Sequence, residues 1–275
     1  MRVSKLVFNF YIISSAHVAL SAVSLAWVTL VEYHIPTDKS LLCFVFFATV
    51  VGYNFVKYFG MAQFHYRRLA TWLKPVQVFS VLCFVAMCCF FVKLQAISQL
   101  VVFGFGLVTF LYAIPFLPKR LFRDQKQNLR SIGGLKVYII ALVWVGVTVF
   151  LPLVNNHFNI STNVLLTALQ RYVFIVALML PFEIRDLQYD SLKLATIPQK
   201  IGVKRTKIMG ALLLFCFVLL DVFNSESTLT EMLATFAVAI ITAIFIIGAK
   251  TGQPQYYSSF WVEGIPIVWL LLLVS

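Results

Sequence analysis

Charged residues are scarce in this chain of 275 residues: Asp, Glu, Lys and Arg make up 12% of it, whereas hydrophobic residues make up 61%. A soluble globular domain usually has about 25% charged and about 45–50% apolar residues. The composition therefore excludes an ordinary soluble protein and predicts an integral membrane protein. Low-complexity tracts and Gly/Ser-rich linkers are also lacking, so we expect residues 1–275 to form a single domain.

Cysteines and acidic residues are few as well. The five cysteines all lie in apolar segments without a metal-type CxxC pair, so small apolar packing is their expected role. The chain has only 10 acidic residues against 22 basic ones, a net charge of +12. This excess does not predict nucleic-acid binding, because the cytoplasmic loops of membrane proteins collect Lys and Arg.

Long apolar runs fill most of the chain. A membrane-crossing helix needs about 20 such residues, and we expect nine spans, the first of them a retained helix rather than a signal peptide. They are residues 6–31, 40–60, 76–93, 96–116, 135–155, 164–182, 207–223, 229–249 and 256–274.

The basic residues are distributed unevenly around these spans. With the N-terminus in the cytoplasm, 19 of the 22 Lys and Arg residues fall on the cytoplasmic side, and only Lys39, Lys93 and Arg171 remain. Nine spans then place the C-terminus on the opposite side of the membrane. We therefore expect any chemistry at the cytoplasmic face, in the bilayer.

A cluster of charge closes the sixth predicted span. If its helix continues past a proline, Glu183, Asp186 and Asp190 share one face at positions i, i+3 and i+7. A hard cation such as Mg²⁺ would relieve the repulsion between the three carboxylates. Ordinary ion pairs with Arg185 and Lys193 would do the same, and the stripe alone does not decide between them.

The surrounding sequence resembles the UbiA superfamily of intramembrane prenyltransferases. Asp186-Leu-Gln-Tyr-Asp190, followed by Thr196-Ile-Pro198 and Gly202, is similar to that family's second aspartate-rich motif. The segment Tyr112-Ala-Ile-Pro115, the pair Lys119-Arg120 and the count of nine spans extend the resemblance over the chain. It implies an all-α fold of two four-helix halves plus one helix, around a cavity at the cytoplasmic face.

The resemblance also implies a function and a site. The function would be transfer of an isoprenoid chain from a prenyl diphosphate to a lipophilic, aromatic or quinone-like acceptor. Asp186 and Asp190 would be the catalytic, Mg²⁺-bridging carboxylates, with Glu183 on the same stripe as a further metal ligand. Lys119, Arg120 and Lys193 would contact the diphosphate.

The first motif of the family departs from its usual NxxxDxxxD pattern. Asn54 is present, but Tyr58 and Ala62 stand where the two aspartates would be. Asn54 is still expected to contact substrate, and Lys57 could supply a positive charge close to the position of the missing metal. The loss of two metal ligands leaves open whether the chain is catalytic.

Three ionisable residues within the spans are further functional candidates: His17, Arg171 and Glu263. Glu263 lies nearer to the cytoplasmic end and is a candidate for binding or deprotonating the acceptor. Two alternatives to the enzyme remain. One is a non-catalytic relative that binds a prenyl diphosphate or quinone, and the other is a transporter, although no matching pair of short, interrupted spans supports it.

Overall fold

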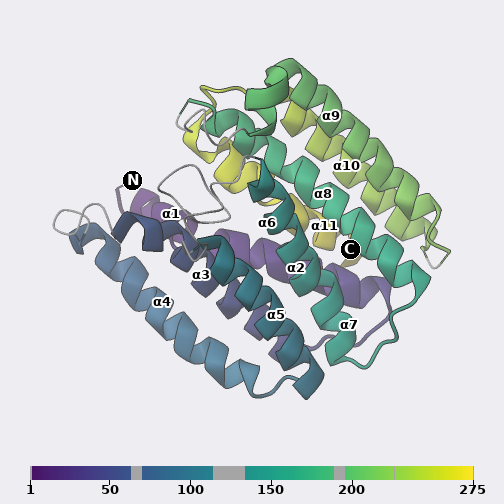
Figure 1. Cartoon of the computed structure of the whole chain (residues 1–275), viewed down its shortest axis with the longest axis horizontal. Helices are drawn as coiled ribbons and strands as arrows, with labels where there is room; N and C mark the ends of the chain where they lie inside the picture. The colour runs from purple at the N-terminus through teal and green to yellow at the C-terminus, as the bar shows by residue number, and fades with distance from the viewer. Residues whose placement is uncertain (1, 63–69, 114–133, 189–195, 226, 275) are drawn as a thin grey trace, which may run out of the picture.

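The computed structural model describes residues 2–62, 70–113, 134–188, 196–225 and 227–274, and the regular elements in these ranges are all helical (Figure 1). Elements η3 and η5 are short π-helical segments: η3 joins α6 to α7 without a break, and Glu263 and Gly264 separate η5 from α11. The elements are α1 (Arg2–Ile13), α2 (Ala16–Glu32), α3 (Lys39–Ala62), α4 (Ala70–Phe91), α5 (Ala96–Ala113), α6 (Leu135–Val145), η3 (Gly146–Phe150), α7 (Leu151–Asn155), α8 (Thr162–Asp186), α9 (Ile197–Val222), α10 (Leu229–Gly248), η5 (Tyr257–Val262) and α11 (Ile265–Val274).

Seven helical segments of the described ranges are long and apolar enough to cross a membrane. The bent pair of α1 and α2 raises this number to eight if the pair counts as one span. The multi-pass membrane architecture is therefore confirmed, whereas the predicted count of nine is not. The seven segments are Lys39–Tyr58, Lys74–Phe91, Ala96–Ala113, Leu135–Asn155, Thr162–Asp186, Leu229–Gly248 and Tyr257–Val274.

Helix α9 accounts for the difference. It covers the span predicted at 207–223, but four basic residues lie in its first part and Asp221 lies near its end. Only residues 208–220 between them are free of charge, which is short of the roughly 20 residues that a span needs. Helix α9 nevertheless packs along α8 and α10, both of which pass the criteria for a span.

Helix α2 lies between two groups of helices. On one side α3 packs against α4 and α5, and α5 continues to α6 and α7; on the other side α8, α9, α10 and α11 pack in succession. Helix α2 contacts α3 and η3 of the first group and α11 of the second, as its central position in Figure 1 shows. This is the arrangement of two four-helix halves plus one helix.

The first predicted span is broken rather than continuous. Ser15 has a left-handed backbone (φ 64°), and α1 meets α2 at 58°. Asn54 of α3 holds this break: its Oδ1 accepts a hydrogen bond from Ser15 Oγ at 2.8 Å, and its Nδ2 donates to the Ser14 carbonyl at 3.0 Å. Asn54 Nδ2 also donates to Ser80 Oγ of α4 at 2.8 Å. The break is therefore fixed by polar contacts from α3, and α4 holds the Asn54 side chain that makes them.

Close packing of the halves depends on small and aromatic residues. At the start of η3, a Cβ added to Gly146 would lie 2.3 Å from the Phe105 ring of α5, so this contact requires glycine. In the second half, the rings of Phe174, Phe217 and Trp269 meet with centroids 5.0–5.4 Å apart. All three rings are fully buried and join α8, α9 and α11 in one core.

Candidate functional site

The predicted carboxylate stripe lies at the end of α8. The helix continues through Pro181 and ends at Asp186, whereas Asp190, the last member of the stripe, lies outside the described residues. Lys136, at the start of α6, places its Nζ 3.0 Å from Glu183 Oε1 and 3.7 Å from Asp186 Oδ2. Glu183 is only 1% exposed and Asp186 23%. The carboxylates of Glu183 and Asp186 thus share one cation, Lys136, which comes from a helix that is distant in sequence but packs against α8.

Arg185 neutralises the outer of these two carboxylates. Its Nε and Nη2 both lie 2.8 Å from Asp186 Oδ1, and its guanidinium lies 5.4 Å from the centroid of the Phe182 ring. The ion pair expected between Arg185 and the stripe is therefore present. Lys136, one of the 19 basic residues expected on the cytoplasmic side, is a further partner of the stripe.

Several predicted site residues lie outside the described residues: Asp190, Lys193, Lys119 and Arg120. Within the described ranges, no group of three or more His, Cys, Asp and Glu side chains could hold a metal ion. Glu183 and Asp186 do fit a cation, because both already approach the Lys136 ammonium. Carboxylate oxygens are also the ligands that Mg²⁺ prefers. The Mg²⁺ site itself stays a prediction, with Asp190 as its third carboxylate.

Lys57 of α3 and Glu263, between η5 and α11, belong to the same region. Among the described residues, Lys57 and Arg185 lie close enough to the Glu263 carboxylate to attract its negative charge. Lys57 and Arg185 also act on one another. The ends of α3 and α8 and the junction before α11 therefore come together, and both Lys57 and Arg185 keep exposed surface.

Aromatic residues adjoin this charged group. Trp144 of α6 donates a hydrogen bond from Nε1 to the Tyr53 hydroxyl at 2.9 Å. The Lys57 ammonium lies 6.0 Å from the centroid of the Tyr53 ring. Tyr53 also interacts electrostatically with Glu263 and with buried Tyr112, which opens the segment 112–115 of the sequence resemblance. We call Tyr53, Lys57, Lys136, Glu183, Arg185, Asp186 and Glu263 the polar cluster.

Asn54 and Tyr58 are on α3 but have partners elsewhere. The amide of Asn54 is engaged by Ser14, Ser15 and Ser80, as described above. The Tyr58 hydroxyl donates to the Ile13 carbonyl at 3.1 Å. Both residues line an apolar cavity of about 370 Å³ between α3 and α4. The structure thus gives Asn54 a role in holding the α1–α2 break, and its contact with substrate stays a prediction.

Glu263 is positioned by the π-helical turn before it. The Gly264 amide donates to the Phe260 carbonyl at 2.9 Å, and a Cβ on Gly264 would come within 2.8 Å of that oxygen. His17 Nε2 lies 2.8 Å from the same carbonyl, so Nε2 carries the proton and Nδ1 accepts from the Tyr11 hydroxyl at 2.7 Å. His17 therefore joins α1, α2 and η5, and Ser21 of α2 donates to the Glu263 carbonyl.

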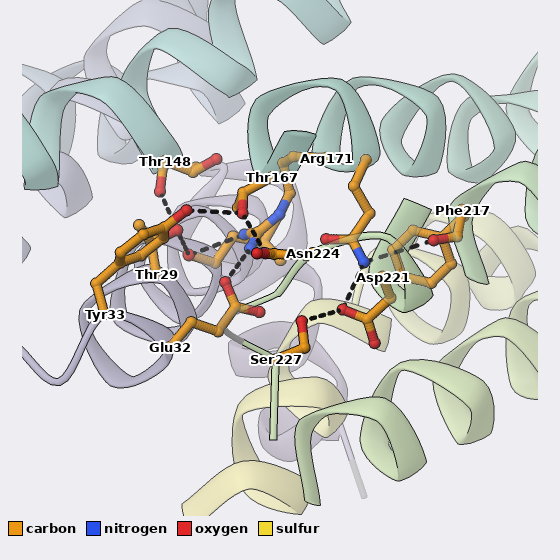
Figure 2. Close-up of polar contacts among 12 residues, drawn as sticks. Thr29, Glu32, Tyr33, Thr148, Thr167, Arg171, Phe217, Asp221, Asn224 and Ser227 are labelled. Carbon is orange, nitrogen blue, oxygen red and sulfur yellow. Dashed lines mark hydrogen bonds and ion pairs between the residues drawn. The ribbon is translucent and has the colours of Figure 1, made fainter. Parts of the chain in front are cut away.

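Arg171 lies far from the polar cluster. It pairs with Glu32 at 3.4 Å (Figure 2) and is fully buried. Its guanidinium also donates to the Leu25 carbonyl at 2.9 Å and lies 4.7 Å from the centroid of the Trp269 ring. Arg171 and Glu263 are thus separate features of the protein.

Comparison with known proteins identifies the fold. No protein-family model matches the sequence, and no curated protein matches it. The structure is similar to that of a digeranylgeranylglyceryl phosphate synthase, with a TM-score of 0.59 and 13% sequence identity. The match covers 96% of this chain and 94% of that one. That protein is a UbiA-superfamily intramembrane prenyltransferase, so this chain has a UbiA-like fold.

Proposed function

We propose that this protein is an intramembrane prenyltransferase, which moves an isoprenoid chain from a prenyl diphosphate to a lipophilic acceptor, aromatic or quinone-like. The observation that supports it is the meeting of Lys57, Lys136 and Arg185 with Glu183, Asp186 and Glu263 at one end of a UbiA-like bundle. The three cations can bind the diphosphate of the donor. Glu183 and Asp186 can bind its metal ion, and Glu263 can take a proton from the acceptor.

The three described cations bind the donor in this proposal. Lys57, Lys136 and Arg185 come from α3, α6 and α8, so together they can contact a diphosphate from different sides. Glu183, Asp186 and Asp190 would hold Mg²⁺, which when bound neutralises charge on the diphosphate. Lys119, Arg120 and Lys193 are proposed as further diphosphate contacts.

The reaction needs one bond broken and one formed. The bond between the prenyl carbon and the diphosphate oxygen breaks, and its electron pair leaves with the diphosphate. The lysine and arginine side chains stabilise the charge that develops there. The acceptor nucleophile then forms a bond to the same carbon, and Glu263 takes the acceptor's proton. The ring of Tyr53, next to Lys57, offers an aromatic face to positive charge on the prenyl carbon.

The membrane orientation follows from the charge distribution. Lys57, Lys136 and Arg185 of the polar cluster are among the 19 basic residues that the predicted topology places on the cytoplasmic side. Cytoplasmic loops are enriched in such residues. We therefore propose that the polar cluster faces the cytoplasm, with the N-terminus on that side and the C-terminus on the other.

The second candidate is a UbiA-like protein that binds a prenyl diphosphate or a quinone without turnover. Two observations favour it. The aspartates of the first motif are replaced by Tyr58 and Ala62, and Glu183 and Asp186 already have cationic partners in Lys136 and Arg185. Nothing in the described part of the chain favours a transporter over either candidate.

One experiment separates the two candidates. The purified protein is incubated with Mg²⁺, radiolabelled geranylgeranyl diphosphate and a panel of aromatic, quinone and glycerol-based acceptors. An enzyme releases pyrophosphate and yields a labelled lipid product, and Glu263→Gln abolishes both without weakening donor binding. Saturable donor binding without product over the whole panel supports the non-catalytic protein. Absence of donor binding contradicts the enzyme and leaves, of the second candidate, only a protein that binds a quinone.

A further inference from the structure

A second polar cluster is buried at the opposite end of the bundle, around the last turns of α2 and α9 and the first turn of α10 (Figure 2). Arg171 lies 12 residues before Glu183 on α8, or about 18 Å along the helix. This second cluster is therefore distinct from the proposed prenyl site. Because it lies within the apolar part of the protein, each of its charges needs a partner.

The cluster encloses a small cavity of about 10 Å³, room for roughly one water molecule or one dehydrated ion. The side chains that line it are polar or ionisable, without an aliphatic member. Its neutral oxygen-bearing residues include Thr167, Gln170, Asn224 and Ser227. Carboxylate, amide and hydroxyl oxygens are typical ligands of hard cations.

Two of the three carboxylates at this cavity are already compensated. Glu32 pairs with the Arg171 guanidinium at 3.4 Å. Glu231 accepts from the backbone amide of Thr228 at 2.7 Å, in the first turn of α10, where the helix dipole favours a negative charge. Neither carboxylate therefore requires a further counter-ion.

Asp221 is different. Its Oδ1 accepts from Gln170 Nε2 at 3.1 Å and from Ser227 Oγ at 3.0 Å, and both donors are neutral. Its Oδ2 is buried and has no hydrogen-bond partner among the residues that the structure describes, and the residue as a whole is only 7% exposed. A buried carboxylate oxygen without a partner costs free energy. A cation beside this oxygen would remove that cost.

We infer that the cavity is a binding site for one monovalent hard cation of the size of Na⁺, held by the carboxylate of Asp221 and by neutral oxygens of Thr167, Asn224 and Ser227. One uncompensated carboxylate matches one positive charge. A divalent ion would need more negative charge, and the described residues hold no group of three acidic, His or Cys side chains that could ligate a metal. The ion links α8 to α9 and so stabilises the second half of the bundle.

The test is thermal unfolding of the purified protein in sodium chloride and in choline chloride at equal concentration and pH. Choline is too large for the cavity, so it controls for ionic strength. Binding to the folded state should raise the melting temperature in sodium by about 2–4 °C, with saturation as sodium increases. Asp221→Asn keeps an oxygen for Gln170 and Ser227 but removes the charge. It should lose the sodium effect and melt in choline no lower than the wild type.

Two further variants keep the test decisive. Asp38→Asn changes a carboxylate that binds Asn155 and the Leu41 amide at the same end of the bundle, and it should retain the full sodium effect. If Asp221→Asn does not fold, Ser227→Ala should raise the sodium concentration of half effect several-fold. Equal melting temperatures in sodium and choline would mean that the cavity holds only water, and would overturn the inference. So would a sodium effect that survives in Asp221→Asn, or a larger effect of calcium.

Discussion

The ammonium nitrogen of Lys136 lies 3.0 Å from the carboxylate of Glu183, although the two residues come from α6 and α8. The same ammonium is 3.7 Å from Asp186. Lys136 thus neutralises part of the charge on two of the proposed metal ligands. In the proposed enzyme, Glu183 and Asp186 would also hold Mg²⁺, which would supply positive charge to the donor diphosphate.

Removing Lys136 should destabilise the protein through Glu183. Lys136→Met leaves a carboxylate that is 1% exposed without this counter-ion, and breaking a buried pair from one side costs about 2–4 kcal/mol when one partner keeps some exposure. The double variant Lys136→Met with Glu183→Gln should recover most of the loss. Melting temperatures of the wild type, both single variants and the double variant measure the coupling. Additive effects of the two changes would show that the pair contributes nothing.

The carboxylates should determine Mg²⁺-dependent binding of the donor. Glu183→Gln and Asp186→Asn each remove a negatively charged ligand, and we expect at least about tenfold weaker binding of a prenyl diphosphate in the presence of Mg²⁺. Titration calorimetry with and without Mg²⁺ measures the effect. Asp38→Asn, at the other end of the bundle, is the matched control. If the carboxylates serve only as partners of Lys136 and Arg185, affinity should stay the same or improve.

The sequence predicts the positions of the helices well, because hydropathy reports directly on the apolar surroundings of each segment. The predicted spans 40–60, 96–116 and 229–249 agree with α3, α5 and α10 to within a few residues. The break in the first span was missed. It depends on the left-handed backbone of Ser15 and on hydrogen bonds from Asn54, which lies 39 residues further along the chain. No local pattern reveals such a contact.

The site was predicted in part. The stripe of Glu183 and Asp186 follows from helical spacing, and α8 does continue through Pro181 to present it. The roles of Lys136 and Tyr53 were missed, since nothing in the order of the sequence pairs α6 with the end of α8 or α3 with Glu263. The aromatic and basic residues of this membrane protein are so numerous that composition does not single out either one.

The close approach of η3 and α5 should depend on glycine at position 146. Gly146→Ala places a methyl group 2.3 Å from the Phe105 ring, and overpacking of this kind costs about 1–3 kcal/mol. Phe105→Leu should relieve the contact in the double variant. Gly104→Ala, with no atom within 4 Å of its added Cβ, is the control and should leave the melting temperature unchanged. Equal melting temperatures for the two alanine variants would contradict the packing of these helices.

Accessibility labelling should establish the orientation in the membrane. A cysteine at Ser225, between α9 and α10, should react with a membrane-impermeant maleimide only from outside the cell. One at Gln255, between α10 and η5, should react only after the membrane is opened. Both positions are exposed, and the charge distribution places them on opposite sides. The reverse pattern would move the polar cluster to the outer face and contradict the proposed cytoplasmic site.

Lys57 should replace part of the positive charge that a second metal ion would bring. Its Nζ donates a hydrogen bond to Ser15 Oγ at 2.8 Å, and it interacts electrostatically with Glu263 and Arg185. A fixed ammonium can neutralise a diphosphate as a point charge. Lys57→Ala should therefore abolish prenyl transfer and weaken donor binding, whereas Ser15→Ala, which removes a hydrogen-bond partner of Lys57 and of Asn54 but no charge, should keep most of both.

The number of bound metal ions tests the same idea independently of turnover. With Tyr58 and Ala62 in place of the two aspartates, a second Mg²⁺ has no carboxylate from the first motif, and titration of the diphosphate-bound protein should show about one tightly held ion. Tyr58→Asp with Ala62→Asp should raise this number without being required for activity. Two tightly held ions in the wild type would contradict the role of Lys57, as would a Lys57→Ala variant with unaltered donor binding and turnover. If the wild type binds the donor without consuming it and the two aspartates restore turnover, then catalysis was lost with the first motif, because Lys57 holds the diphosphate but cannot replace the second ion in the reaction.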